Sequence, residues 1–384
     1  MNILMIEWKA YGQQDIRQAF LAEGHHVVLF PFPVREDARW NSPLEKNLEA
    51  ALHKEVPDIV FSFNFFPVVS KVCNKEYIRY LSWVYDCPHV SLYSCAILNP
   101  CNTVYVFDKE LYAEFYHAGI SSIHYLPLAA DTERLDAIDR DAALPFLYDV
   151  SFVGATYTEM NNFYDRMDEL SEYTRGYLDA LMSSQMKVYG YNFIQESLEP
   201  VIDDLYRALP YDPNPDGAET REYFYAQYVI NRKITSMERT ELFSAVAQHH
   251  TLDLFTFDRR FTMPNLNNHG SVEFYHQMPK VFKQSKINLN ITLRSIKSGI
   301  PLRAFDIMGS GGFLLSNFQA DFLDSFVPGE DFVYYESKED LQQKIKYYLA
   351  NEQERQEIAK NGHDKLTADH TYRHRVREML SLVE

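Results

Sequence analysis

Short apolar runs and helical spacings alternate along the first third of the chain. The run at 2–8, NILMIEW, is apolar and is followed by Gly12, which is typical of a buried strand and its turn. Apolar residues at helical spacing over 13–23 predict a helix, and the run at 26–32 predicts the next strand. The same order continues with a helix at about 42–54 and strands at 58–64, 77–86, 102–108 and 123–131. This βαβα pattern predicts a parallel sheet with helices on both faces.

A polar, irregular stretch at 131–147 precedes a second series, and we interpret it as a linker. The second series contains strands at 148–159, 186–192, 252–257, 286–293, 313–317 and 331–337, and helical regions at 160–183, 193–250, 274–285, 301–309, 338–366 and 370–384. The chain is therefore predicted to form two α/β domains, at 1–145 and 146–365, with a helical insertion at about 193–250 and a final helix at 366–384. Domains of this kind bind ligands at the carboxyl ends of their strands, in the cleft between them.

The composition of the chain limits the kinds of partner that it is expected to bind. The 384 residues are 46% hydrophobic, which is ample for a core, and they carry a formal net charge of -17. That charge argues against a nucleic-acid binder or an anionic-membrane binder, although a local basic pocket for a phosphate stays possible. No apolar stretch approaches the roughly 18 to 20 residues of a membrane span, and the N-terminus lacks the features of a signal peptide. The four cysteines show no C-x-x-C spacing, so we expect free thiols in a reducing cytoplasm.

The segment 298–317, SGIPLRAFDIMGSGGFLLSN, places opposite charges side by side on a short helix. Pro301 marks the start of this helix, and Gly309 marks its end. Arg303 and Asp306 are three residues apart, so they lie together on one stripe of the helix surface. An ordinary surface ion pair between two flexible turns explains this spacing as well as a ligand site does.

The chemistry of the segment fits a nucleoside diphosphate. A helix N-terminus has free backbone N–H groups and a partial positive charge, which suit a phosphate. The preceding loop, 294–299, adds Arg294 and Lys297 at the same end. Arg303 is suited to clamp a diphosphate through two hydrogen bonds, and Asp306 to accept hydrogen bonds from two ribose hydroxyls.

The C-terminal part of the chain resembles the CgeB-like (spore maturation) glycosyltransferases, whose C-terminal domain is of the glycosyltransferase group 1 type. The resemblance is carried by KINLNITL, GIPLRAFDIMGSGGFLLSN, FVPGEDFVYYES and the helices after it, and HTYRHRVREML. YDVSFVGATY is similar to the strand that opens this part of the family, and SWVYDCP looks like its aromatic-x-x-Asp-x-Pro element. The match covers about 150–384 and is looser in the N-terminal half.

The resemblance implies a GT-B fold, with two Rossmann-like domains whose parallel sheets face each other across a cleft. The N-terminal domain would bind the acceptor, the C-terminal domain the nucleotide sugar, and the final helix would pack back on the N-terminal domain, with Tyr372 as a brace. The implied reaction is sugar transfer from a nucleotide-diphosphate sugar, most readily a UDP-linked one, without a bound metal or another cofactor. One departure is that the family has Glu where this chain has Asp306, which could weaken or alter the donor site.

Further candidates for the donor site lie at predicted strand ends and turns. Gly154 would let a diphosphate approach the backbone, with Thr156 or Tyr157 donating hydrogen bonds, although a plain β–α turn explains it equally well. Tyr191, after Gly190, could stack on a base, although a role in the core or a turn is the more ordinary one. The resemblance adds Gly311 and Gly312 as points of close backbone approach, and the alternating Asn288 and Asn290 could face the sugar or serve only as loop hydrogen bonds.

Transfer with inversion needs a general base that takes the proton from the acceptor hydroxyl. Asp86 is the first candidate, because it follows a predicted strand and precedes Pro88 and His89. Glu7, at the end of the first strand, is the second candidate. A turn-stabilising role explains Asp86 without any catalysis. Transfer with retention would not require such a base.

Two other function classes stay open at this point. A non-catalytic scaffold or binding protein could use the same fold, and it predicts no donor turnover. A nucleotide-sugar epimerase would also have a double Rossmann plan, but the G-x-G-x-x-G fingerprint after the first strand is absent.

The histidines show no metal-binding motif, and the adjacent pair His249 and His250 points apart on a helix. The acceptor could be a protein, a glycan or a small molecule, and the 193–250 insertion could select it or form a homodimer contact.

Overall fold

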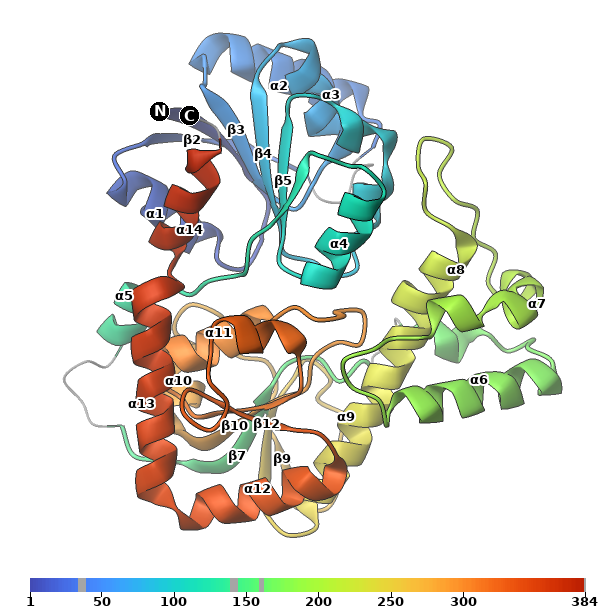
Figure 1. Cartoon of the computed structure of the whole chain (residues 1–384), viewed down its shortest axis with the longest axis vertical. Coiled ribbons are helices and arrows are strands. Elements are labelled where there is room, and N and C mark those ends of the chain that lie inside the picture. The colour runs from blue at the N-terminus through green and yellow to red at the C-terminus, as the bar shows by residue number, and fades with distance from the viewer. Residues whose placement is uncertain (34–38, 139–143, 159–161, 383–384) are drawn as a thin grey trace. The chain divides into compact units, whose positions relative to one another are not determined.

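The computed structural model describes residues 1–33, 39–138, 144–158 and 162–382. The chain divides into two compact units, shown as ribbons in Figure 1. Unit 1 contains Met1–Ala129, Pro213–Thr220 and Thr371–Glu384, and unit 2 contains Ala130–Asp212 and Arg221–His370. Each unit is built around one parallel sheet that has six strands within the described residues.

Unit 1 has the strand order β2-β1-β3-β4-β5-β6, and all of these strands run parallel. Its elements are β1 (Asn2–Glu7), α1 (Gln13–Ala22), β2 (His26–Pro31), α2 (Ser42–Glu55), β3 (Ile59–Phe63), α3 (Pro67–Lys75), β4 (Arg79–Val84), β5 (Asn102–Val106), α4 (Lys109–His117), β6 (Ile123–Tyr125) and α14 (Tyr372–Ser381). The central strand β3 is buried along its whole length, which explains its continuous apolar run.

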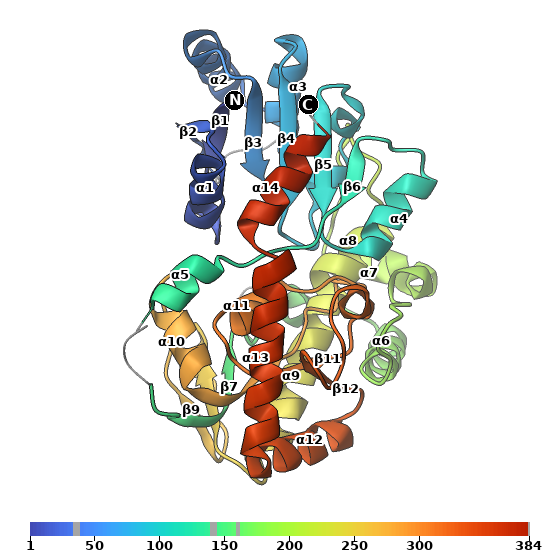
Figure 2. The ribbon, with the colours of Figure 1, turned by 60° about the vertical axis from the view of Figure 1, so that its left-hand side comes forward.

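The C-terminal helix α14 completes unit 1. It packs against α1, as Figures 1 and 2 show. Glu23, which caps the end of α1, accepts hydrogen bonds from Arg373 at 2.8 Å and Arg377 at 2.7 Å. The Tyr105 hydroxyl, on β5, donates to the Met379 carbonyl at 3.0 Å. A segment at the far end of the sequence is therefore part of the core of the N-terminal domain.

A short segment from the middle of the chain also belongs to unit 1. Gly217 pairs with Ser94 through an antiparallel bridge. Arg39 forms ion pairs with Asp216 at 2.6 Å and with Glu219 at 2.8 Å, and all three side chains are largely buried. The segment 213–220 is thus held by a charged cluster within unit 1.

Unit 2 has the strand order β12-β11-β10-β7-β8-β9, again all parallel. Its elements are α5 (Thr132–Ala137), β7 (Tyr148–Val153), α6 (Glu172–Gln185), α7 (Ile202–Ala208), α8 (Arg221–Phe224), α9 (Asn231–Ala247), β8 (Leu252–Phe255), β9 (Leu266–Asn268), α10 (Gln277–Gln284), β10 (Ser285–Asn290), α11 (Leu302–Gly309), β11 (Leu314–Asn317), β12 (Val333–Tyr335), α12 (Lys338–Ala350) and α13 (Glu352–Asp369). Residues 225–230 form a π-helical segment that joins α8 to α9. Helix α13 runs beside α11 (Figure 2).

Several boundaries differ from the sequence prediction. The predicted strand at 186–192 is wrong, because these residues form a loop whose carbonyls bond to side chains and not to a neighbouring strand. Strand β9 was not predicted, since its three residues are too short to show a pattern. The predicted linker contains α5, and unit 2 begins at Ala130, ahead of the predicted boundary at 145. Residues 139–143 of that linker and 159–161, where a long helix was expected to begin, lie outside the described residues.

Candidate functional site

The carboxyl edge of the unit 2 sheet brings together the residues around α11. Strand β7 is followed directly by Gly154, β10 ends at Asn290, and the loop after β10 leads into α11. Because the strands are parallel, their carboxyl ends lie on one edge of the sheet. In open α/β sheets this edge is where ligands bind.

Arg303, in the first turn of α11, reaches across this edge. Its Nη1 donates to Asn290 Oδ1 at 2.9 Å, and its guanidinium lies over the Phe152 ring, 4.8 Å from the ring centroid. Among the described residues, Arg303 forms no ion pair with a carboxylate. Most of its N–H groups therefore remain available for an anionic ligand.

Gly154 makes this position of Arg303 possible. Its φ of 153° is one that side chains rarely adopt, and a Cβ at this position would overlap the Arg303 Nη2 atom. The two residues thus lie in direct contact, although they are far apart in the sequence. The space that a side chain at position 154 would take is filled by the Arg303 guanidinium.

A second arginine supports the first, and nothing in the sequence pattern pointed to it. Arg239, on α9, is buried and donates to the carbonyls of Ala155 and Ile291. Its guanidinium also lies over Phe152, with 5.0 Å to the ring centroid. Burial and the charge of Arg239 lower the pKa of Arg303 to about 9, which still leaves Arg303 charged near neutral pH. A bound anion would relieve the repulsion between these two cations.

Asp306 lies on the same helix as Arg303, but its side chain is only 3% exposed. Its negative charge raises the pKa of Arg303 and so partly offsets the effect of burial. The predicted neighbourhood of a cation and an anion on this helix is therefore present. Contact between Asp306 and a ribose would have to use the small exposed part of the carboxylate.

The Arg294 guanidinium is not a free donor at this edge of the sheet. This corrects its predicted role in binding the diphosphate. Nε and Nη2 bond to the two carboxylate oxygens of Glu238, both at 2.8 Å, and the pair is buried. Nη1 donates to the Val188 carbonyl at 2.8 Å, and Nη2 also donates to the Met186 carbonyl at 3.2 Å. The side chain holds the 186–188 loop against α9, and its donors are taken up by Glu238 and the loop carbonyls instead of a diphosphate.

Gly311 and Gly312 lie at the opposite, amino-terminal edge of the sheet, which corrects their predicted role as well. They connect the end of α11 to the start of β11. A Cβ on Gly312 would lie 2.7 Å from Asn288 Nδ2. Asn288 is itself buried and donates to the Phe282 carbonyl at 3.1 Å, so it serves the core and does not face a sugar. Gly312 is needed for close packing there.

Tyr191 follows the loop at 186–188 and ends no strand, because that loop is not part of the sheet. Its ring is 56% exposed, and its hydroxyl donates to Glu196 Oε1 at 2.6 Å. Tyr189, two residues earlier, is closer to the Arg294–Glu238 pair, since its hydroxyl donates to Glu238 Oε1 at 2.5 Å. The structure thus leaves Tyr191 as an exposed ring that could stack on a planar group.

Asp86 lies at the carboxyl edge of the unit 1 sheet, directly after β4 and Tyr85, and is exposed. The buried Asn64 holds it, because Asn64 Nδ2 donates to Asp86 Oδ2 at 2.7 Å and Asn64 Oδ1 accepts from the Asp86 backbone N–H at 3.1 Å. Asn64 itself has a φ of 61°. Glu7, the second candidate, is the exposed last residue of β1 on the same edge. The role of Asn64 could not be seen in the sequence.

His89 lies close to Asp86 but packs inward. Its Nε2 lies 2.9 Å from the Phe65 carbonyl oxygen. Burial lowers the pKa of His89 below its ordinary value of 6.5, although the charge of Asp86 opposes this shift. His89 is therefore neutral near neutral pH.

The described ranges, 1–33, 39–138, 144–158 and 162–382, contain no group of three or more His, Cys, Asp or Glu side chains that is arranged to hold a metal ion. No helix there is long and apolar enough to cross a membrane.

Solved structures of similar fold identify the architecture. A glycosyltransferase from Rickettsia africae ESF-5 aligns with a TM-score of 0.54 at 11% identity, over 100% of this chain and 98% of that chain. A sucrose-phosphate synthase from Thermosynechococcus elongatus aligns with a TM-score of 0.53 at 12% identity, over 100% and 98%. Alr3699/HepE from Anabaena, in complex with UDP and glucose, aligns with a TM-score of 0.54 at 10% identity, over 99% of each chain. The predicted GT-B fold, with two Rossmann-like domains, is confirmed.

The sequence itself matches a family over its C-terminal part. Residues 235–381 match the family described as Glycosyl transferase-like. This match confirms the predicted class of enzyme, a glycosyltransferase, whereas the CgeB-like subfamily and the cytoplasmic location stay predictions. No curated protein matches the chain in sequence.

Proposed function

We propose that this chain transfers a sugar from a nucleotide-diphosphate sugar to a hydroxyl group of its acceptor, and that it does so without a metal. The donor that we propose is a UDP-linked sugar. The observation that carries the proposal is Arg303, a partly buried cation that lies against Gly154 and has no carboxylate partner among the described residues. A diphosphate is the group that such a guanidinium binds best. The family match over 235–381 supports the same reading.

Catalysis in this proposal depends on stabilising the leaving group, the nucleoside diphosphate. Negative charge builds on the nucleoside diphosphate as the bond to the sugar breaks, and donors fixed in place before the reaction stabilise that charge. Arg303 supplies one such donor, and Arg239 adds a second positive charge behind Phe152. The N-terminal end of α11 adds backbone N–H groups. Two arginines and a helix end could thus replace the metal ion that other transferases use for this purpose.

UDP is the nucleotide to test first, because Alr3699/HepE, a protein of the same fold, has been solved with UDP and glucose. Asp306 is our candidate for the ribose hydroxyls, and Tyr191 for stacking on the base. The acceptor is a hydroxyl of a protein, a glycan or a small molecule. A non-catalytic binding protein is the alternative outcome of the experiments below.

The experiment is a calorimetric titration of UDP, GDP, TDP and their common sugars, with a chelator present. We expect one nucleotide to bind the wild type. Arg303→Gln should weaken that binding about tenfold or more, which is roughly 1.4 kcal/mol, the scale of a hydrogen bond to a charged group. Arg207→Gln is the matched control, because Arg207 is an exposed arginine of unit 2 on α7. Asp306→Glu, which restores the residue of the resembling family, should bind at least as tightly as wild type.

A folded wild-type chain that binds none of these nucleotides would contradict the proposal and favour the scaffold. Binding that appears only when a divalent metal replaces the chelator would contradict metal independence alone. Equal affinity in wild type and Arg303→Gln would move the donor site away from the carboxyl edge of unit 2.

Asp86 is our candidate for the general base, and its test separates chemistry from binding. Asp86→Asn should leave nucleotide affinity within about twofold and lower the transfer rate by about 100-fold or more, the usual scale of general-base catalysis. The Asn64→Ala variant should lower the rate less, because it releases Asp86 and the Tyr85 backbone N–H from their hydrogen bonds but keeps the carboxylate. Glu7→Gln is the comparison at the same sheet edge. If Glu7→Gln abolishes transfer and Asp86→Asn does not, the assignment to Asp86 is wrong.

A further inference from the structure

A groove of about 1190 Å³ follows helix α9 on the surface of unit 2. Its walls are the end of α6 with the loop at 186–189, one face of α9, and the start of α12. Helix α9 contacts both α6 and α12, and Figure 1 shows the three helices in this order. The volume exceeds about 300–1,000 Å³, the usual range of small-molecule pockets, so the groove suits an extended ligand.

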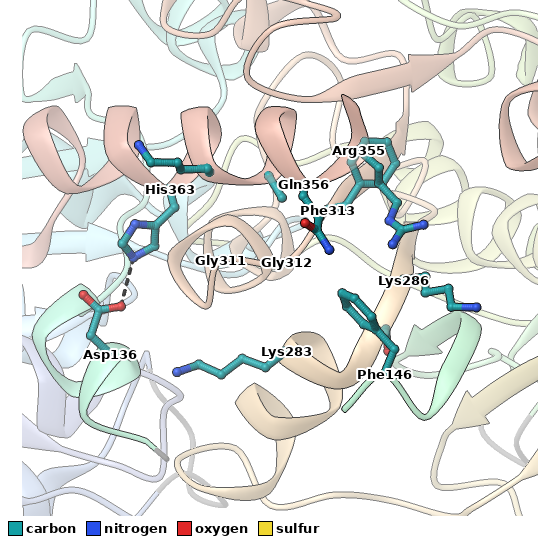
Figure 3. A pocket seen from close by; sticks show the side chains of 13 residues that line it. Asp136, Phe146, Lys283, Lys286, Gly311, Gly312, Phe313, Arg355, Gln356 and His363 are labelled. Atoms are coloured by element: carbon teal, nitrogen blue, oxygen red, sulfur yellow. Dashed lines mark hydrogen bonds and ion pairs between the residues drawn. The ribbon is translucent and has the colours of Figure 1, made fainter. Parts of the chain in front are cut away.

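This groove is separate from the donor edge and from a smaller cavity of unit 2. Arg303 and Asp306, at the carboxyl edge, do not line it. The smaller cavity, of about 380 Å³, lies around Arg355 between α13 and the loop from α11 to β11 (Figure 3). The two share no lining residue. A ligand in the groove would therefore bind independently of a nucleotide at the carboxyl edge.

Hydroxyl and amide side chains form a row along the groove. Ser236, Thr240 and Ser244 are four residues apart, so they lie on one face of α9. Gln248 follows just after the end of this helix. Gln342 of α12 reaches the same row, with its Nε2 3.5 Å from Gln248 Oε1. Hydroxyls and amides both donate and accept hydrogen bonds, and the hydroxyls of a sugar do the same.

Ser236 is the member of this row that most needs a ligand. It is only 5% exposed, and it lines the groove. Its carbonyl accepts a hydrogen bond from Thr240 Oγ1 at 2.8 Å, but its hydroxyl has no hydrogen-bond partner in the part of the chain that the structure describes. A buried hydroxyl without a partner costs free energy. A ligand hydroxyl in the groove would supply the missing partner.

The charges of the lining are nearly balanced, which argues against a strongly charged ligand. Three lysines and four glutamates line the groove. Lys338 pairs with Glu241 at 2.7 Å, and Glu238 pairs with Arg294 at 2.8 Å. The chain as a whole has a formal net charge of -17, so a polyanion would be repelled. A neutral, polar ligand fits these charges best.

Apolar side chains lie among the polar ones, and they include Met186, Met237 and Tyr189. A sugar ring presents C–H groups on its faces and hydroxyls around its rim, so it needs apolar contacts and hydrogen bonds side by side. Peptides are usually bound as an added strand at a sheet edge, or as a helix in an apolar groove. The lining residues here come from helices and loops, and many of them are polar. The lining therefore favours a carbohydrate over a peptide.

We propose that this groove binds a neutral oligosaccharide. Sugar hydroxyls would bond to Ser236 and the row beside it, and the C–H faces of the rings would pack against Met186, Met237 and Tyr189. Binding in the groove requires neither a donor nucleotide nor a transfer step, so this function goes beyond the one proposed above.

The test screens the full-length chain on an array of neutral and acidic oligosaccharides and titrates the best-binding sugar by calorimetry. We expect a neutral oligosaccharide to bind. Ser183→Trp should weaken its binding about tenfold or more, because Ser183 is exposed on α6 and lines the groove, which the larger ring would fill. Ser184→Trp is the matched control, since Ser184 is the next exposed residue of α6 and does not line the groove. Ser236→Ala should weaken binding about threefold to tenfold, the scale of one neutral hydrogen bond.

Arg303→Gln distinguishes the groove from the donor edge, and it should leave oligosaccharide binding within about twofold of wild type. Four outcomes would overturn the proposal. The folded chain binds no oligosaccharide of the array, or it binds only acidic ones. Ser184→Trp weakens binding as much as Ser183→Trp does. Arg303→Gln abolishes binding and Ser183→Trp does not. Because Ser183 is exposed, its variant keeps the test valid if Ser236→Ala fails to fold.

Discussion

At the carboxyl edge of the unit 2 sheet, the position of the Arg303 guanidinium depends on a few single neighbouring residues. The sequence predicted that Arg303 would bind a diphosphate, and the structure adds the reasons why its guanidinium lies where it does. Asn290 accepts its hydrogen bond at 2.9 Å, Phe152 supports its plane, and Gly154 leaves room for it. Each neighbour can be tested without touching Arg303 itself.

Gly154→Ala is the sharpest of these tests. A Cβ at position 154 would overlap Arg303 Nη2, and the φ of 153° is strained for alanine. We expect nucleotide affinity to fall about tenfold or more, measured by calorimetry. Gly176→Ala is the matched control, because Gly176 lies in the exposed middle of α6 with open space around it. That variant should bind normally and gain up to about 1 kcal/mol of stability. Unchanged affinity in Gly154→Ala would exclude this glycine from the donor site.

His89 gives a pH dependence to the stability of unit 1. Its pKa in the folded chain lies below its ordinary value of 6.5 because of burial. The unfolded chain then binds more protons below about pH 6.5, so this contribution to stability is complete above that pH and is lost as the pH falls. The loss is at most about 1.4 kcal/mol per pH unit for one proton.

Urea unfolding followed by tryptophan fluorescence measures this effect in unit 1 alone, since all three tryptophans, Trp8, Trp40 and Trp83, belong to it. His89→Gln keeps a donor for the Phe65 carbonyl but cannot titrate. It should show a smaller loss of stability between about pH 7.5 and about pH 5.5. Equal losses in the two proteins would assign the pH dependence to other groups.

At the scale of elements, the loop at 186–192 shows how a side chain can replace a strand partner. Its apolar pattern predicted a strand, but two of its carbonyls accept hydrogen bonds from Arg294, which is paired with Glu238 of α9. Two of these carbonyls are satisfied by the Arg294 guanidinium, and Gln185 Nε2 donates to the Val188 and Tyr191 carbonyls. The loop therefore depends on this buried ion pair.

Arg294→Met should destabilise unit 2 by about 3–5 kcal/mol, because it leaves the Glu238 carboxylate buried without its partner. The double variant Arg294→Met with Glu238→Met should recover most of that loss, since no lone charge remains. Lys338→Met is the control, because it removes an exposed pair with Glu241 and should cost less than about 1 kcal/mol. Calorimetric unfolding measures all three. A double variant as unstable as the single one would show that the pair stabilises through its hydrogen bonds to the loop.

At the scale of the whole molecule, unit 1 is discontinuous in sequence. It needs the N-terminal 129 residues, the segment 213–220 and the last helix. Helix α14 buries Tyr372, whose hydroxyl lies 2.6 Å from that of Tyr85 and whose ring lies against Trp83 with 6.0 Å between centroids. The end of the chain thus stabilises the sheet formed by its beginning.

A chain truncated after His370 should therefore lose stability mainly in unit 1. The truncation exposes the apolar surface that α14 covers on α1 and β5, and it removes the partners of Glu23. Tryptophan fluorescence should report unfolding of unit 1 at least about 5 °C below that of the intact chain. Removal of residues 382–384 alone is the control and should change little. If the truncated chain keeps the same midpoint, α14 contributes nothing to the stability of unit 1.

The sequence by itself determined most of the strands and helices and the two parallel sheets, and its resemblance to a glycosyltransferase family predicted the class of enzyme. Buried parallel strands leave continuous apolar runs, and helices that cover them leave a 3.6-residue period, so these features are local and readable. The same local signals identified Arg303 and Asp306 on one helix. They could not show which edge of the sheet a glycine turn occupies, and this is why Gly311 and Gly312 were assigned to the wrong end.

Only the tertiary structure decided the partners of the charged side chains. Arg294 and Arg303 look alike in the sequence, but Arg294 is paired with Glu238, whereas Arg303 lies against Gly154 and pairs with no carboxylate in the part of the chain that the structure describes. The cavity around Arg355 likewise unites α10, β10 and α13. Electrostatic interactions act over a few ångströms of space, whatever the separation along the chain. The sequence therefore predicts which residues carry charge, and the fold decides which of those charges remain available to a ligand.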